Sequence, residues 1–384
     1  MKRDIDKPLG MHGPAPGRPG LGIGKAVVPG LVLAAIVGTG LFFSLGQENW
    51  RTPVTEIAAK PEAPAAPVAP APVEEAVKTT DPAKADGPSI IRVNPEPKPS
   101  NSVLVIRDPS ALGQNLRIAH LPDRALIEQT ESGPLPVRSA DGRRPVDVYA
   151  RPWSGARGAR IAIVIGGLGL SQTGTQAAIA KLPGEVTLAF APQGNSLGRW
   201  MQTARQDGHE ILMQLPLEPF DYPRVNPGRN TLTVDAAEGD NIAHLRWALS
   251  RTTNYTGVMN YMGARFTAEN AAFQPVMDEL GKRGLLYLDD GSSARSIAPE
   301  LALKNRVPFA GADQTIDASH ERGDILKKLD ELERTARAKG TALGVGSGFD
   351  ATIAAVAEWI GEARKRGIEF VPVSALAFDP EKRN

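Results

Sequence analysis

The second half of the chain alternates between two hydrophobic patterns. Short apolar runs recur between Arg160 and Ser374: IAIVI, VTLAF, EILMQL, GVMNYM, LLYLDD, VPFAGAD, ALGVG and IEFVPV. Stretches with helical spacing separate them, and several end in glycine after basic residues, which is typical of helix C-termini. Alternating strands and helices predict parallel βαβ units. About eight strands in ~220 residues favour a β/α barrel, complete or irregular, over residues 158–378, followed by a tail at 379–384.

The start of the chain has a different pattern, with one long apolar stretch. Residues 26–45 contain no charged residue, and their length is close to the ~20 residues of a spanning helix. Basic residues occur in 1–25, which predicts a cytoplasmic N-terminus, a single pass through the inner membrane and a periplasmic main domain. A cleaved signal peptide is the alternative, although its apolar core would be only ~7–15 residues long.

Two further segments lie between this predicted anchor and the barrel. Residues 46–101 are rich in Pro and Ala and too poor in large apolar residues to form a core, which predicts a solvated, disordered spacer. Residues 102–157 contain short apolar runs and turn signals such as SADGRRP. They predict a small β-rich collar, with helix-poor surface loops as the alternative.

Composition excludes several functions. The formal net charge is +1, and no basic cluster is interleaved with aromatic residues, so a nucleic-acid partner is not expected. The chain has no cysteine, which excludes disulfides, thiolate catalysis and cysteine-based zinc sites.

The first strand of the barrel ends in a glycine-rich turn, IAIVIGGLG. A dinucleotide site requires G-x-G-x-x-G and an acidic residue ~20 positions later. Gly167 and Gly169 fit the first two positions, but Gln172 occupies the third, and no acid ends the second strand. The turn therefore does not predict a nucleotide site. The mouth of a β/α barrel, where catalytic groups lie, is the better interpretation.

The order of the short motifs carries a family resemblance. IAIVIGGLG, VTLAFAP, GHEILMQLPLEPFDYP, GVMNYMGARF, LLYLDDGSSARS and GVGSGFDATI follow one another between about residues 160 and 377. This series resembles the divergent polysaccharide deacetylase family of bacterial envelope proteins. The resemblance implies a deacetylase-type β/α barrel and metal-assisted hydrolysis of an N-acetyl group on a sugar.

The same resemblance implies that the metal ligands are missing. The family pattern places an aspartate pair and two histidines at positions that are Gly166, Gly167, Tyr261 and Ser347 in this chain. Glycine offers no ligand atom, and neutral tyrosine and serine are poor zinc ligands. We therefore expect no metal-ligating residues and no cofactor, with a divalent metal only if the family activity persists.

Acidic residues near strand ends are the remaining catalytic candidates, and Asp289 is at a position where the family keeps an aspartate. The candidates are Asp289, Glu218 and Asp313. Paired carboxylates could hydrolyse a glycosidic bond without a metal, bind a hard cation, or serve only structural roles.

Binding without turnover is the third possibility, because aromatic faces and planar polar groups hold sugars. The candidate substrate contacts are Asn260, Tyr261, Arg265, Asp289, Arg295 and Ser347. The sequence thus predicts a membrane-anchored protein of carbohydrate metabolism that binds envelope polysaccharide or peptidoglycan, or an envelope protein partner. The alternative is an active hydrolase, either a deacetylase with a re-sited metal or an acid-pair glycosidase.

Overall fold

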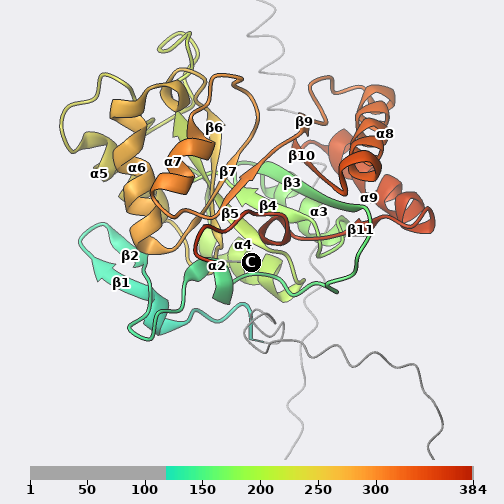
Figure 1. Ribbon diagram of the computed structural model, residues 1–384, viewed down its shortest axis with the longest axis horizontal. Coiled ribbons are helices and arrows are strands. Elements are labelled where there is room, and N and C mark those ends of the chain that lie inside the picture. The colour runs from blue at the N-terminus through green and yellow to red at the C-terminus, as the bar shows by residue number, and fades with distance from the viewer. Residues whose placement is uncertain (1–117, 383–384) are drawn as a thin grey trace, which may run out of the picture. The chain divides into compact units, whose positions relative to one another are not determined.

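The computed structural model describes residues 118–382, whose centre is a curled parallel sheet with helices on its outer face (Figure 1). The strands are β3 (Arg160–Leu168), β4 (Thr187–Phe190), β5 (Ile211–Leu217), β6 (Gly257–Met262), β7 (Leu286–Asp289), β8 (Phe309–Gly311), β9 (Gln314–Thr315), β10 (Thr341–Ser347) and β11 (Glu369–Phe370). The main helices are α3 (Gln172–Lys181), α4 (Leu197–Gln206), α5 (Asp240–Leu249), α6 (Asn270–Arg283), α7 (Ala298–Lys304), α8 (Arg322–Lys339) and α9 (Asp350–Lys365). This is the α/β architecture that the alternating pattern predicts.

The barrel is irregular rather than complete. The strand order is β8-β7-β6-β5-β4-β3-β10-β9, with parallel pairs throughout. Only Ala312 and Asp313 separate β8 from β9, the two ends of this order, and β8 pairs with β7 while β9 pairs with β10. One bent segment therefore joins both edges of the sheet.

The last predicted strand does not extend the barrel as a regular strand would. β11 pairs with β3 at only two positions, Glu369 with Arg160 and Phe370 with Ile161. The Val371 N–H still donates to the Ile161 carbonyl, but Pro372 comes next and has no N–H to continue the ladder. The run IEFVPV therefore leaves the sheet after two residues.

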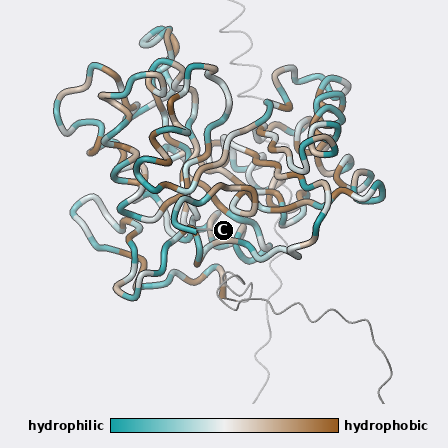
Figure 2. The backbone as a smooth tube through the Cα atoms, in the orientation of Figure 1, coloured by the Kyte–Doolittle hydropathy of each residue, from teal (hydrophilic) through white to brown (hydrophobic). Residues whose placement is uncertain are grey.

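Side-chain alternation divides the core into two layers. Ile161, Ile163 and Ile165 of β3 pack outward against the helices, whereas Ala162 and Val164 point into the barrel. Both sets are buried, so the strands are apolar on both faces, as expected for a parallel sheet covered by helices. Figure 2 shows hydrophobic residues concentrated on these central strands and hydrophilic residues along the outer helices.

The segment before β3 covers the base of the barrel, where the strands begin. It contains the antiparallel hairpin of β1 (Ile127–Thr130) and β2 (Gly133–Pro136), and the short helix α2 (Pro145–Val148). Val146 joins the inner core cluster, and its backbone N–H donates to the carbonyl of Gly284, just before β7. The described part of the predicted collar thus lies at the end of the barrel opposite the strand C-termini.

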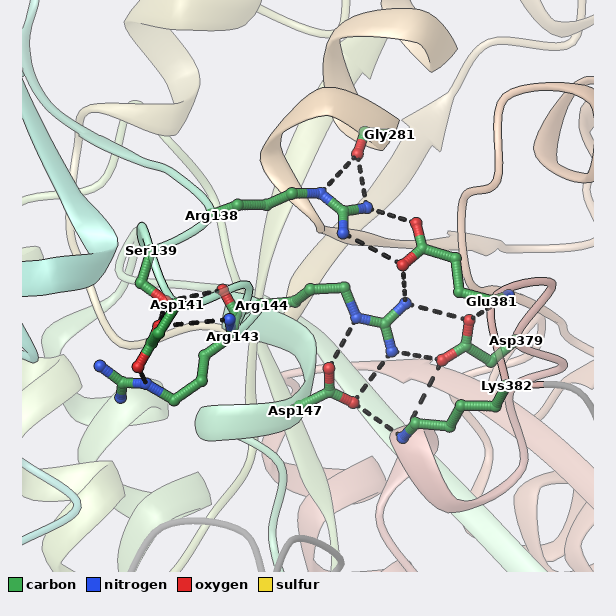
Figure 3. Close-up of polar contacts among 10 residues, drawn as sticks. All are labelled: Arg138, Ser139, Asp141, Arg143, Arg144, Asp147, Gly281, Asp379, Glu381 and Lys382. Atoms are coloured by element: carbon green, nitrogen blue, oxygen red, sulfur yellow. Dashed lines mark hydrogen bonds and ion pairs between the residues drawn. The ribbon is translucent and has the colours of Figure 1, made fainter.

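A network of ion pairs fastens the C-terminal tail to this base (Figure 3). Buried Arg144 pairs with Asp147 at 2.6 Å and with Asp379 at 2.5 Å. Arg138 pairs with Glu381 and also donates to the Gly281 carbonyl at the end of α6. We call Arg138, Arg144, Asp147, Asp379 and Glu381 the basal latch.

The predicted cytoplasmic tail at 1–25, anchor at 26–45 and spacer at 46–101 lie outside the described residues. Among residues 118–382, no helix has the length and apolar character needed to cross a bilayer.

Candidate functional site

A cavity of about 780 Å³ opens at the carboxyl ends of the strands. Its walls come from β3, β5, β6, β9 and β10 and from segments that follow the strands, including those after β4 and β7. In β/α barrels, this end carries the ligand site because the variable loops converge there. We call this space the mouth cavity.

Alternation along each strand determines which side chains face the mouth cavity. Inward positions of the lower barrel, such as Val164, Leu212 and Met259, form the inner core cluster. Two residues further along each of five strands, the next inward positions line the cavity: Gly166, Gln214, Tyr261, Asp290 and Ser347. This layer is the floor and wall of the site.

Gly166 and Gln214 fit closely together in this layer. Gln214 is only 5% exposed, and its Oε1 accepts a hydrogen bond from the Gly167 N–H at 2.8 Å. An ideal Cβ at position 166 would lie 2.7 Å from Gln214 Nε2, closer than real Cβ contacts. Any side chain at 166 would therefore push the amide out of its present position.

Apolar and aromatic side chains form the exposed rim. Leu170 is 55% exposed, Phe349 47% and Tyr261 38%, and all three line the mouth cavity. The ring of His320 lies 4.4 Å from that of Phe349, tilted by 44°, which holds one face of the phenyl group. Exposed aromatic faces at a cavity entrance suit the apolar faces of sugar rings.

Two carboxylates on the cavity wall have backbone partners. Asp317, 4% exposed, accepts from the Ser347 N–H at 2.7 Å and from Thr352 Oγ1 at 2.9 Å. Asp290 accepts from the Ser292 N–H at 2.9 Å. Burial raises the pKa of Asp290, the hydrogen bonds from Ser292 and Asn260 oppose this, and the neighbouring Asp289 charge adds to it.

Asn260 and Asp289 lie behind this wall, because each precedes an inward-facing residue. Asn260 donates to the Met262 carbonyl at 2.8 Å and accepts from the Asp290 N–H at 2.8 Å. Asp289 accepts from the Gly291 N–H and from Ser296 Oγ. Neither is among the cavity-lining residues, and their role as substrate contacts stays a prediction.

The remaining predicted site residues lie outside the lining of the mouth cavity. Glu218 is buried, pairs with Arg265 and accepts from the Val234 N–H, which ties down the loop after β5. Asp313 pairs with Lys339 at 3.1 Å and accepts from the Leu343 N–H. Arg295 is exposed on the loop before α7. The structure does not bring these residues together in the mouth cavity.

The sequence profile of the divergent polysaccharide deacetylase family matches residues 163–377. The chain belongs to this family. The match confirms the resemblance carried by the strand-end motifs and covers every strand from β4 to β11 and most of β3.

Relatives in this family share the barrel part of the chain. An uncharacterized protein of Haemophilus influenzae is 26% identical over 195 residues, covering 51% of this chain and 69% of the relative. The uncharacterized protein YibQ of Escherichia coli is 23% identical over 222 residues, covering 58% and 68%. A crystal structure of an uncharacterized Agrobacterium tumefaciens C58 protein is 59% identical, with a TM-score of 0.63, covering 64% of this chain and 99% of that one.

The donor set of the site does not fit the metal that the family resemblance implies. Among residues 118–382, no three His, Cys, Asp or Glu side chains come together as a possible metal site. His209 lies two residues before β5, at the base, where its Nδ1 is 2.8 Å from the Val186 carbonyl and its Nε2 is 3.3 Å from that of Ile179. Burial lowers the pKa of His209, against the effect of these carbonyl contacts.

Sequence reasoning missed two residues of the mouth cavity, Gln214 and Phe349. Gln214 is the one polar residue in the otherwise apolar run ILMQLPL, at an inward position of β5. Strand alternation alone could have identified it. Phe349 has no comparable signal, because its exposure depends on how the loop after β10 turns into α9.

Proposed function

We propose that this protein binds envelope glycan in the mouth cavity without hydrolysing it, as a degenerate member of its family. The family membership supports a carbohydrate ligand. The proposal rests on the identity of the residues at the four positions where the family pattern places its metal ligands. Gly166, Gly167, Tyr261 and Ser347 all line the cavity, and none of them supplies a carboxylate or imidazole.

The rim supports a sugar chain as the ligand. Tyr261 and Phe349 present partly exposed rings, and backbone groups and the Gln214 amide supply polar contacts below them. Ligand sites combine a largely apolar wall with a few fixed polar groups in this way. The glycan is a polysaccharide of the cell envelope, with peptidoglycan as the first choice, and an envelope protein that works on it is a further partner.

The predicted anchor and spacer extend the proposal to the whole protein. A helix at 26–45 would hold the protein in the inner membrane, with the barrel in the periplasm. About fifty extended residues at ~3 Å each would give the spacer a reach on the order of 150 Å.

An active hydrolase is the second candidate, because three carboxylates, Asp290, Asp317 and Asp350, line the same cavity. A pair of carboxyl groups about 5–10 Å apart across a glycosidic bond can act as acid and nucleophile or base. Asp317 is already engaged by Ser347 and Thr352, which favours a structural role for this residue.

Glycan titration tests the proposed binding. We expect the full-length protein to bind soluble chitooligosaccharides or peptidoglycan fragments saturably, with equal affinity with and without EDTA. Tyr261→Ala should weaken binding roughly tenfold through loss of ring stacking. Phe220→Ala is the matched control, because Phe220 is 59% exposed but does not line the cavity. Absence of saturable binding by the unmodified protein would overturn the proposal.

A further inference from the structure

A second cleft opens at the base of the barrel, at the opposite end from the mouth cavity. It has a volume of about 630 Å³ and lies where β11 begins beside β3. Its lining comes from residues 151–154 before the first barrel strand, from Glu185 before β4, and from residues between 364 and 370. β3 runs from this end to the mouth, and its nine residues at ~3.3 Å each span about 25–30 Å. We call this second space the base cleft.

The base cleft contains a fixed aromatic ring. Trp153 is half-buried and lines the cleft, and the guanidinium carbon of Arg160 lies 5.3 Å from the centre of its ring. A cation at this distance is attracted to the face of the ring and holds the indole in place. Because the ring is already ordered, a ligand that packs on it loses little side-chain entropy.

Two buried polar atoms beside this ring have no partner. Glu369 lines the base cleft, and its Oε1 accepts from Ser154 Oγ, whereas its Oε2 has no hydrogen-bond partner in the described chain. Arg160, the register partner of Glu369 in the sheet, has an Nε–H that likewise has no acceptor there. Buried polar atoms of this kind are costly until a ligand or water bonds them. An anion satisfies only the arginine and a cation only the glutamate, whereas a hydroxyl group both donates and accepts.

The formal charges of the cleft lining cancel. Arg151 and Arg364 lie on its wall together with Glu185 and Glu369. Glu185 pairs with Arg151 at 3.4 Å and with Arg364 at 2.9 Å, which holds both guanidinium groups at the wall. A lining with two charges of each sign gives a charged ligand no net attraction. The base cleft therefore suits a neutral ligand that carries hydroxyl groups and one apolar face.

We infer that the base cleft is a second glycan-binding site, in which a sugar ring packs on Trp153 and one of its hydroxyl groups bonds Glu369 and Arg160. A hexose ring has an apolar face for the indole, and its hydroxyl groups donate and accept. The terminal torsion of a glutamate is broad, so Oε2 turns toward the cleft at little cost. The inference goes beyond the proposed function, because the chemistry of the base cleft selects its ligand without the mouth cavity.

Tryptophan fluorescence reports on this site separately, because Trp153 lines the base cleft and no described tryptophan lines the mouth cavity. We expect a β-1,4-linked tetramer of N-acetylglucosamine to change the emission of the full-length protein saturably. Trp153→Phe keeps an aromatic ring but removes this indole, so the emission change should be lost while calorimetry still detects bound tetramer. Absence of an emission change in the unmodified protein would overturn the inference.

Two substitutions assign the emission change to the chemistry of the base cleft. Glu369→Gln keeps the shape of the side chain but replaces one acceptor oxygen by an NH₂ group, so the Kd measured by emission should rise about tenfold. Arg364→Ala removes a half-exposed guanidinium from the wall and should raise this Kd severalfold. It decides the question if Glu369→Gln does not fold. Glu362→Gln, exposed on α9 and outside the cleft lining, is the control and should match the unmodified protein.

The outcomes separate this inference from the proposed function. If the emission change weakens in Tyr261→Ala but not in Glu369→Gln, the signal comes from the mouth cavity, and the inference is wrong while the proposed function stands. If it weakens in Glu369→Gln while Tyr261→Ala leaves calorimetric binding unchanged, the base cleft binds glycan and the mouth cavity does not. If the tetramer does not bind at all, both are wrong. Thermal unfolding establishes that each variant is folded.

Discussion

At the residue scale, small differences in position decide which groups can meet a ligand. Strand alternation brings Tyr261 into the mouth cavity and turns Asn260 away from it, although the two are neighbours in one motif. The sequence points to the strand C-termini, where the mouth cavity lies, and to the motif that contributes Tyr261 to its lining. Alternation singles out Gln214, the one polar residue in an apolar run, but where two polar residues are adjacent, as in GVMNYM, a shift of one residue reverses which of them faces inward.

Asn260 is therefore expected to act by positioning the residues around it. Its side chain joins the end of β6, where Met262 has a φ of 59°, to the backbone of Asp290. Asn260→Ala removes both hydrogen bonds and should lower the free energy of unfolding by about 2 kcal/mol. Glycan binding should weaken as well, because Tyr261 loses its support. Urea unfolding and glycan titration measure the two effects.

Asn195→Ala serves as the control for this substitution, because Asn195 is exposed and its side chain makes no hydrogen bond to another described residue. It should change neither quantity. Unchanged stability in Asn260→Ala would contradict the role assigned to the side chain.

At the element scale, the prediction was most accurate where strands are long and apolar. GVMNYM is β6 residue for residue, and IAIVI lies within β3. VPFAGAD predicts one strand, but only Phe309–Gly311 form β8, which pairs with β7, and the pairing with β10 begins after Ala312 and Asp313, in β9. Local pattern cannot encode that division, because it depends on how far the whole sheet has curled.

The basal latch was likewise invisible in the sequence, since Arg144 and Asp379 are 235 positions apart. Burial raises the pKa of Asp379, but the hydrogen bond and charge of Arg144 outweigh this and lower it. A carboxylate with a lowered pKa stabilises the fold above its unfolded pKa of about 4, and this stability is lost as the pH falls through the folded value.

Arg144→Met should therefore cost stability in a pH-dependent way. We expect the free energy of unfolding to fall by about 2–3 kcal/mol at pH 7. This is less than the loss for a fully buried ion pair, because Asp147 is partly exposed. The difference from the unmodified protein should shrink as the pH falls below about 4 and through the lowered pKa values of Asp147 and Asp379. Denaturant unfolding across pH 3 to 7 measures it. Arg143→Met, which removes exposed ion pairs, should show only a small effect.

At the scale of the whole molecule, the barrel has a covered base and an open mouth. Residues 118–157 and the C-terminal tail pack at the base, where Val146, Val371 and Val373 complete the inner core. The mouth cavity remains accessible at the other end, with an aromatic rim and a polar floor. The anchor at 26–45 and the spacer at 46–101 stay predictions from composition.

The central claim is that this barrel binds glycan without family-type hydrolysis. The most direct measurement is the metal content of the purified protein by mass spectrometry, together with acetate release from chitooligosaccharide or peptidoglycan fragments after incubation with added Zn²⁺ or Mg²⁺. We predict less than about one tenth of an equivalent of bound metal, which is the level of trace contamination. We also predict no acetate release above the protein-free control. Stoichiometric metal with acetate release, abolished by EDTA, would contradict the account.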